Sequence, residues 1–179
     1  MMKMMQQDLR KNMAFLSYSI PVLWNKESYQ DLAYFHKPVS DELMKQWRSR
    51  GYNHLEVNGL LYDQTAGRKM PVFTKAIDQE FLWLKNKGYA FYKMKQMTVM
   101  PSHVDRYELY SKIFNIKREK IVRVLVMLED WKSGHYFEID GEAQVNWKAG
   151  QCYQWTSETH NAANLGTEPR YTLQITGHV

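Results

Sequence analysis

The chain has 179 residues, which is the size of one domain and is enough for a hydrophobic core without disulfides. Hydrophobic residues make up 44% and charged residues 24% of the sequence, and no apolar run approaches the roughly 20 residues of a membrane helix, so extensive disorder and a membrane span are excluded. The net charge is +5, but Lys and Arg are scattered without a nucleic-acid-binding signature, so no nucleic-acid partner is expected.

The cysteine content bears on the compartment. Cys152 is the only cysteine, which excludes an internal disulfide, and no apolar leader with a small-residue cleavage site opens the chain. We therefore expect a protein of the reducing cytoplasm, with Cys152 as a small core residue and not a nucleophile. The sequence makes no prediction about oligomeric state.

The first 88 residues are predicted to form a helical and irregular support region. Residues 1–12 are polar and rich in Met and are expected to fray. Residues 40–51 predict a short helix, because Ser40 is placed as an N-cap and Gly51 as a stop. Between short apolar pieces, Asn58-Gly59 predicts a small hairpin.

A second and longer helix is predicted over residues 74–88. Thr74 is its expected N-cap, and Ile77, Phe81 and Leu84 form one apolar stripe at helical spacing. Gly88 is expected to end the helix.

From residue 89 onward, apolar residues alternate with a period of two, which is typical of strands. Six candidate strands follow one another: YAFYKMKQMTVM (89–100), IVRVLVML (121–128), HYFEI (135–139), AQVNW (143–147), QCYQW (151–155) and RYTLQIT (170–176). Turn residues separate them, including Asp140-Gly141. We predict one domain over 1–179 whose core, 89–179, is an antiparallel sandwich or barrel, with the two helices bracing one outer face.

The sequence also contains a candidate metal site. His103 and Asp105 stand two residues apart at the expected end of a strand, where side chains at i and i+2 point the same way. His160 follows a later strand and is the best partner among the six histidines. Two imidazoles and one carboxylate are the protein ligands of open Fe(II) sites.

Arg170 opens the last predicted strand, on one face with Thr172 and Gln174. An inward-facing arginine with a hydroxyl two residues on would form a fork for a carboxylate, whereas an outward-facing one would be an ordinary surface residue. Arg123, a lone charge in an apolar strand, faces either solvent or an anion in the pocket.

The remaining polar candidates carry weaker signals. Tyr107 and Tyr110 are either hydrogen-bonding groups for a ligand or sheet aromatics. His135 and Glu138 would lie on opposite faces of a strand and are not expected to share an ion. The other histidines have no acidic or histidine partner at ligand spacing: His36, His54 and His178.

Residues 89–177 resemble the Fe(II)- and 2-oxoglutarate-dependent oxygenases, whose core is a double-stranded β-helix, a jelly-roll or cupin-like barrel. The resemblance rests on three motifs: His103-x-Asp105, His160 and Arg170-x-Thr172. Within the superfamily, the sequence is most similar to the aspartyl/asparaginyl β-hydroxylase-like branch, through Trp147 and Gly150 before the second histidine. That branch often lacks the carboxylate that Asp105 supplies, and its Arg-x-His is matched here only as Arg123-x-Leu125.

The resemblance implies a catalytic metal site of His103, Asp105 and His160 that holds Fe(II) and is chelated by the keto acid end of 2-oxoglutarate. Arg170 would pair with the distal carboxylate of this cosubstrate, with Thr172 assisting, and Arg123 and Tyr110 are further candidates for contact with it. The implied reaction consumes O₂, converts 2-oxoglutarate into succinate and carbon dioxide, and hydroxylates a small-molecule or peptide substrate, for which the branch suggests an Asp or Asn side chain.

Two alternatives remain open at this point. One is a cupin-like metalloenzyme with the same barrel and metal but no 2-oxoglutarate, which would have no need for the carboxylate fork of Arg170 and Thr172. The other is a jelly-roll module without catalytic activity that binds a sugar or a partner protein. Such a module would hold no transition metal.

Overall fold

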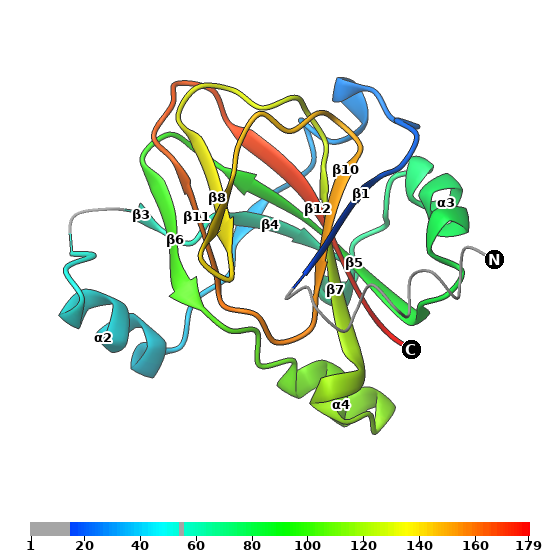
Figure 1. The fold of residues 1–179 in the computed structure, drawn as a ribbon, viewed down its shortest axis with the longest axis horizontal. Coiled ribbons are helices and arrows are strands. Elements are labelled where there is room, and N and C mark those ends of the chain that lie inside the picture. Colours follow the sequence, from blue (N-terminus) through cyan, green and yellow to red (C-terminus); the bar gives the residue numbers. More distant parts are fainter. Residues whose placement is uncertain (1–14, 54–55) are drawn as a thin grey trace.

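The computed structural model describes residues 15–53 and 56–179. The expected fraying of residues 1–12 and the position of His54 lie outside this part of the chain. Eight strands from β5 to β12 form its centre and build two facing sheets (Figure 1). Their bounds are β5 Lys85–Met94, β6 Thr98–His103, β7 Ile121–Met127, β8 His135–Ile139, β9 Glu142–Gln144, β10 Gln151–Trp155, β11 His160–Asn164 and β12 Arg170–His178.

The order of these strands defines the architecture. The large sheet contains β10-β7-β12-β5 and the small sheet β6-β11-β8-β9, and all of these neighbours are antiparallel. Except at the β8–β9 hairpin, the chain crosses to the other sheet after each strand. This winding is a jelly roll of the double-stranded β-helix type, so the predicted fold class is confirmed.

Among the described residues before β5, four short strands extend the sheets. They are β1 Leu16–Ser19, β2 Phe35–His36, β3 Glu56–Val57 and β4 Leu60–Asp63. In the large sheet β1 pairs with β10, β4 with β5 and β2 with β4, whereas β3 joins β6 of the small sheet in parallel. The predicted hairpin at Asn58-Gly59 is therefore wrong, because this dipeptide carries the chain from one sheet to the other.

The helices agree with the sequence only in part. Within residues 15–53 and 56–179, the helical elements are α2 Asp41–Ser49, α3 Phe73–Ile77, α4 Glu108–Phe114 and four 3₁₀ turns, η1 Lys26–Ser28, η2 Gln64–Ala66, η3 Asp78–Phe81 and η4 Arg118–Lys120. The prediction of α2 is confirmed, and Ser40 Oγ accepts a hydrogen bond from the N–H of Leu43 at 3.4 Å. No helix in the described ranges has the length and hydropathy needed to cross a bilayer.

The predicted long helix over 74–88 is wrong in its extent. Its α-helical part ends at Ile77, and Thr74 lies inside this helix and donates its hydroxyl hydrogen bond to Pro71 O. Gly88 does not end a helix, since it pairs with Thr176 in the β5–β12 ladder. The β5–β12 ladder pairs Lys85 with His178 and Gly88 with Thr176 across a register shift, so these residues belong to the strand and not to a helix.

The two predicted helices also brace different faces, and not one. Phe73, Ile77 and Phe81 pack on the outer face of the large sheet, while Trp47 of α2 packs on the small sheet against Val57 and Val99. Figure 1 shows α3 and α2 on opposite sides of the two sheets. The inter-sheet space is thus left for the residues that point inward.

Two strand predictions need correction as well. Residues 89–100 do not form one strand, because the chain turns at Met97, whose φ is +59°, and passes from β5 to β6. The strand predicted at 143–147 ends at Gln144, in β9. Both β11 and α4 were not predicted.

The core between the sheets is aromatic and aliphatic. Large side chains of β5, β7, β8 and β10 meet there, including Tyr92, Leu125, Phe137 and Trp155. Trp131 docks onto this cluster, and its indole N–H donates to His135 O at 2.8 Å.

Cys152 belongs to the cluster on the outer face of the large sheet and is fully buried. Burial raises the pKa of its thiol to about 12. Its predicted role as a core residue is confirmed.

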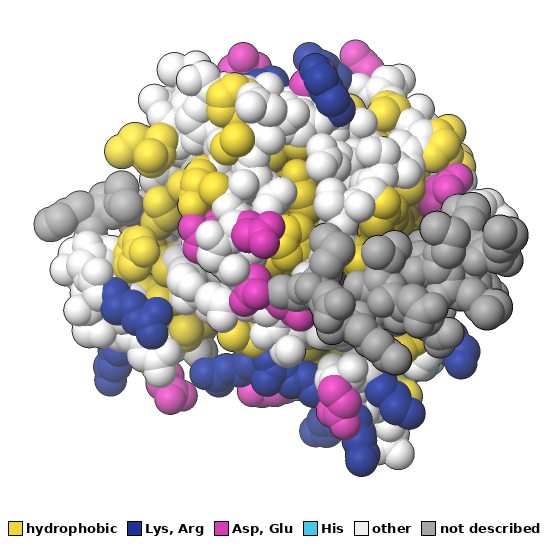
Figure 2. All heavy atoms as spheres, in the orientation of Figure 1, with side chains coloured by type: hydrophobic (Ala, Val, Ile, Leu, Met, Phe, Trp, Pro, Cys, Tyr) yellow, Lys and Arg dark blue, Asp and Glu magenta, His cyan; other side chains and the backbone are white. Residues whose placement is uncertain are grey.

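Surface charge is mixed on the face that Figure 2 shows. Acidic side chains lie near the middle of this face, and Lys and Arg side chains lie along its lower edge, in the region of α2 and α4. No single sign of charge covers the visible face.

Two connections of the small sheet meet at a pair of glycines. Gly134 has φ +85°, and a Cβ placed there would lie 2.2 Å from Gly166 N in the β11–β12 connection. The N–H of Leu165 in that connection donates to Gly134 O at 2.8 Å. The close contact fixes the loop that leads into Arg170.

Gly134→Ala is expected to destabilise the protein by about 2–4 kcal/mol, because it adds a backbone collision to the cost of a positive φ. Gly141→Ala is the matched control, since Gly141 has φ +80° but its Cβ would meet nothing within 4 Å. The control is expected to lose only about 1 kcal/mol. Equal losses for the two variants in denaturant unfolding would contradict the close-contact argument.

Candidate metal centre

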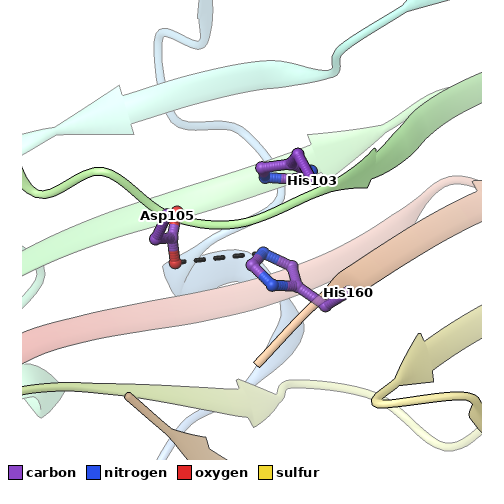
Figure 3. Close-up of side chains that lie close together, drawn as sticks. All are labelled: His103, Asp105 and His160. Atoms are coloured by element: carbon purple, nitrogen blue, oxygen red, sulfur yellow. Dashed lines mark ion pairs between the residues drawn. The ribbon is translucent and has the colours of Figure 1, made fainter. Parts of the chain in front are cut away.

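The side chains of His103, Asp105 and His160 converge on one point inside the barrel. One ligand atom from each residue lies within 4.8 Å of the others. Figure 3 shows the three side chains directed toward one another, with His160 Nε2 3.8 Å from Asp105 Oδ2. The structure thus brings together the three residues that the sequence predicts as metal ligands.

Strand pairing places the two histidines. His103 ends β6 and His160 begins β11, and the two residues are direct partners in the antiparallel ladder. Their rings are 4.4 Å apart between centroids. The pairing register shifts between His160 and Ala162, and an irregularity of this kind re-aims side chains at functional sites.

Asp105 reaches the same point by a different route from the one predicted. β6 ends at His103, so Asp105 lies in the loop that follows and not at the i+2 position of a strand. Its orientation is set by the loop and by its neighbours. The expected convergence is found, but the strand argument for it was wrong.

Both imidazoles are oriented by backbone carbonyl groups two residues earlier in the chain. His103 Nδ1 lies 2.8 Å from Pro101 O, and His160 Nδ1 lies 3.1 Å from Glu158 O. A carbonyl oxygen only accepts, so each Nδ1 carries the hydrogen and each Nε2 is left as the free lone pair.

At neutral pH, a proton does not compete with a metal ion for the Nε2 lone pair of His160. Burial lowers the pKa of the His160 imidazole to about 4, against the opposing attraction of Asp105. A neutral imidazole is the form that binds a metal ion.

Two tryptophans that the sequence analysis did not single out support the histidines. The Trp155 ring lies 4.8 Å from the His160 ring, and the Trp47 ring lies 6.2 Å from the His103 ring. Trp155 comes from the large sheet and Trp47 from α2. Their roles depend on contacts between distant segments, which no local pattern reveals.

Asp105 is held by two neighbours besides the histidines. Arg123 Nε lies 3.3 Å from Asp105 Oδ2, and the Tyr107 hydroxyl donates to the same oxygen at 3.1 Å. Burial acts to raise the pKa of the Asp105 carboxyl, but Arg123 and the two histidines outweigh it and hold that pKa below its ordinary value. The carboxylate is therefore ionised and preorganised.

The three residues line a cavity of about 130 Å³ that extends toward β12. Arg170 and Thr172 line the same cavity and are 4% and 1% exposed, so the inward-facing interpretation of this strand is the one found. The apolar part of its wall includes Leu125 and Phe137.

Arg170 carries a buried charge without a counter-charge. Its Nη1 donates to Tyr136 O at 2.7 Å, but no carboxylate in the described residues forms an ion pair with it. Its Nε and the hydroxyl of Thr172 are buried without a hydrogen-bond partner. Burial lowers the pKa of the Arg170 guanidinium to about 10, against an opposing effect of Tyr92. Such a group is costly unless an anion binds beside it.

Arg123 and Tyr110 lie in different surroundings. Arg123 faces the cavity, where it is engaged by Asp105 and donates to Gln174 Oε1 at 3.1 Å. The Tyr110 hydroxyl lies in α4 within hydrogen-bond distance of Asn86 O and of His178 Nδ1, at 2.9 Å and 3.0 Å. It lies outside the lining of the metal cavity.

His135 and Glu138 have separate structural partners. His135 Nε2 lies 3.0 Å from Glu168 O, and its ring stacks on Trp147. Glu138 accepts from Asn161 at 2.9 Å, so it shares no site with His135. Trp147, singled out by the resemblance, also lies 6.0 Å below the guanidinium carbon of Arg170.

Arg123→Met is expected to lower the free energy of unfolding of the metal-free protein by about 2–3 kcal/mol, because it leaves Asp105 without its cation. The loss stays below that of a fully buried ion pair because this pair is partly exposed. Adding Co(II) should shrink the loss, since the metal supplies a replacement charge. In an Asp105→Asn background the same substitution should cost much less, as denaturant unfolding of the double variant would measure. An undiminished loss in that background would argue against the pair.

The fold and the site together define a double-stranded β-helix protein whose cavity holds a His, Asp and His cluster suited to a metal ion. The sequence matches no protein-family model and no curated protein.

Among solved structures, the fold is similar to that of a Pseudomonas putida prolyl-4-hydroxylase, with 16% identity, coverage of 99% of this chain and 98% of that chain, and a TM-score of 0.55. Weaker similarities include a Klebsiella pneumoniae protein with a double-stranded β-helix domain (14% identity, 54% of this chain and 72% of that chain, TM-score 0.37) and a cupin domain from Schizosaccharomyces pombe (8% identity, 53% and 55%, TM-score 0.39). The similarity to the hydroxylase extends over the whole chain and concerns the fold. Membership of the aspartyl/asparaginyl β-hydroxylase-like branch stays a prediction.

Proposed function

We propose that this protein is an Fe(II)- and 2-oxoglutarate-dependent dioxygenase that hydroxylates a small-molecule or peptide substrate. The observation that carries the proposal is the buried, unpaired guanidinium of Arg170 in the cavity that also contains His103, Asp105 and His160. A metal cluster alone fits many enzymes, whereas a metal cluster facing an uncompensated cation fits a ligand that both binds metal and carries a distant carboxylate.

The donor set fits iron. His103 and His160 offer Nε2 and Asp105 offers a carboxylate oxygen, which is the two-histidine, one-carboxylate set of Fe(II) oxygenases. Bound iron would supply the oxygen activation that couples decarboxylation of 2-oxoglutarate to hydroxylation of the substrate.

The role of Arg170 is to bind and orient the cosubstrate. Tyr136 O fixes one nitrogen of the guanidinium, and the free Nε faces no competing partner in the described chain. The Thr172 hydroxyl, two residues along the same strand face, would add one hydrogen bond to the carboxylate. The surrounding apolar wall excludes water, which strengthens this ion pair.

The charge of the cavity supports a dianionic ligand. Its lining contains two guanidinium groups, Arg123 and Arg170, against the single carboxylate of Asp105. A divalent metal ion increases this positive excess. A cosubstrate with two carboxylates would offset it.

The proposal is tested by adding 2-oxoglutarate to the Fe(II)-loaded protein without oxygen and recording visible absorption. A weak charge-transfer band that saturates with 2-oxoglutarate, and does not form with succinate, is expected. Succinate is the matched control because it has both carboxylates but lacks the keto group that chelates iron. Iron binding without the band would favour a cupin-like metalloenzyme, and no iron binding would favour a jelly-roll binding module.

A further inference from the structure

A second cavity adjoins the metal cavity. This groove, of about 480 Å³, lies between α4 and the inner face of the large sheet. It shares Leu61, Arg123 and Gln174 with the metal cavity, so these three side chains separate the two spaces. We call this space the mouth groove.

Small residues on the large sheet widen the mouth groove. Along the inward-facing side of β5, Tyr92 in the core gives way to Ala90 and then to Gly88. A Cβ at Gly88 would meet no atom within 4 Å. On the neighbouring strand, Thr176 continues the inward face of Arg170 and Thr172.

The helical wall of the mouth groove is apolar. Leu109, Ile113 and Phe114 of α4 line it and are 58%, 59% and 37% exposed. Three large apolar side chains this exposed on a seven-residue helix mark a surface that binds another molecule. They are joined by the ring of Tyr107.

The charged residues of the mouth groove all have partners. The ion pairs are Lys37–Asp63 at 3.3 Å, Lys87–Asp78 at 3.1 Å, Glu108–Arg106 at 3.8 Å and Arg123–Asp105 at 3.3 Å. An acidic or basic ligand would therefore find no free counter-charge among the lining residues. An aspartyl side chain would bring an unpaired carboxylate, which disfavours it as the substrate.

We infer that the mouth groove binds the prime substrate, and that this substrate is a small neutral molecule with an apolar or aromatic face. The reaction it undergoes rests on the proposed function, whereas its binding does not. The wall shared with the metal cavity argues for the substrate as the occupant, and the volume is that of small-molecule pockets. Gln64, Asn86 and Gln174 provide polar groups that can orient such a molecule.

The inference is tested by calorimetric titration of the metal-free protein with three compounds of one skeleton: neutral 2-naphthol, anionic 2-naphthoate and cationic 2-naphthylmethylammonium. Gly88→Leu fills the groove without adding charge. Groove-dependent binding is therefore defined as the difference between binding to the wild type and binding to this variant. We expect saturable binding of 2-naphthol that Gly88→Leu and Ile113→Glu each weaken at least tenfold. For the two charged compounds, the groove-dependent binding should be at least tenfold weaker than for 2-naphthol.

Leu82→Glu is the control variant, because Leu82 is 68% exposed and lies outside the groove lining. It should bind 2-naphthol like the wild type. Equal affinity for the charged compounds, or 2-naphthol binding that neither groove variant weakens, would overturn the inference. A dimer in sedimentation that Ile113→Glu dissociates would assign the groove to a second copy of the chain and overturn it as well.

The two proposals can fail separately. Groove-dependent 2-naphthol binding without a charge-transfer band would leave the binding site and remove the oxygenase function. The band without groove-dependent binding would leave the oxygenase function and remove the inference about the substrate.

Discussion

His160→Ala is expected to weaken Co(II) binding by more than about 100-fold. The loss of a group that merely orients a ligand costs 10- to 100-fold in affinity, so the loss of a ligand itself should exceed this range. His160 is 8% exposed and pairs directly with His103, so the sheet fixes its position. Co(II) is the probe because its visible absorption reports coordination without oxygen chemistry.

His36→Ala is the control for this experiment, because His36 is an exposed residue in β2 far from the cluster in sequence and in sheet order. It should bind Co(II) like the wild type. Circular dichroism and thermal unfolding of both variants would show whether the fold is kept. A folded His160→Ala protein with wild-type Co(II) affinity would show that the metal lies elsewhere.

Arg170→Met is expected to weaken 2-oxoglutarate binding to the Fe(II)-loaded protein by about 10²- to 10³-fold. Removing one partner of a buried charge pair costs about 2–5 kcal/mol, and 1.4 kcal/mol corresponds to a factor of ten. The same variant is expected to unfold at no lower denaturant concentration than the wild type when ligand is absent, because it removes an uncompensated buried cation.

The opposite directions of these two effects identify the role of Arg170. A residue that only supports the fold would lose stability and affinity together. Arg68→Met serves as the control, since Arg68 is an exposed cation outside the metal cavity. Anaerobic titration followed at the charge-transfer band gives the affinity, and unchanged affinity in Arg170→Met would assign the carboxylate fork to another residue.

Part of the site could be predicted from the sequence because strand alternation is a local rule. The period of two in residues 170–176 places Arg170 and Thr172 on one face, and β12 has that arrangement. What the rule could not give was which face is inner. Packing against the small sheet decides this, and Phe137 of β8, which lines the same cavity as Arg170, is distant in the sequence.

Other features depend on tertiary contacts and were missed or wrongly explained. β11 contains His, Asn and Ala and lacks β-branched residues, yet it is a strand because β6 and β8 pair with its two edges. The apolar stripe of residues 74–88 fits both a long helix and a short helix followed by a strand, and only pairing with β12 distinguishes them. Arg123 could be interpreted only once Asp105 was found beside it.

The single cysteine of the chain has a practical consequence. The Cys152 thiol is inaccessible in the native state, and β10 is flanked by β1 and β7. A thiol-specific reagent can therefore reach it only when the large sheet or the segments packed on its outer face open, so the labelling rate reports the opening equilibrium at one known position. Labelling of Cys152 can thus measure local unfolding of the wild-type protein, without an engineered label.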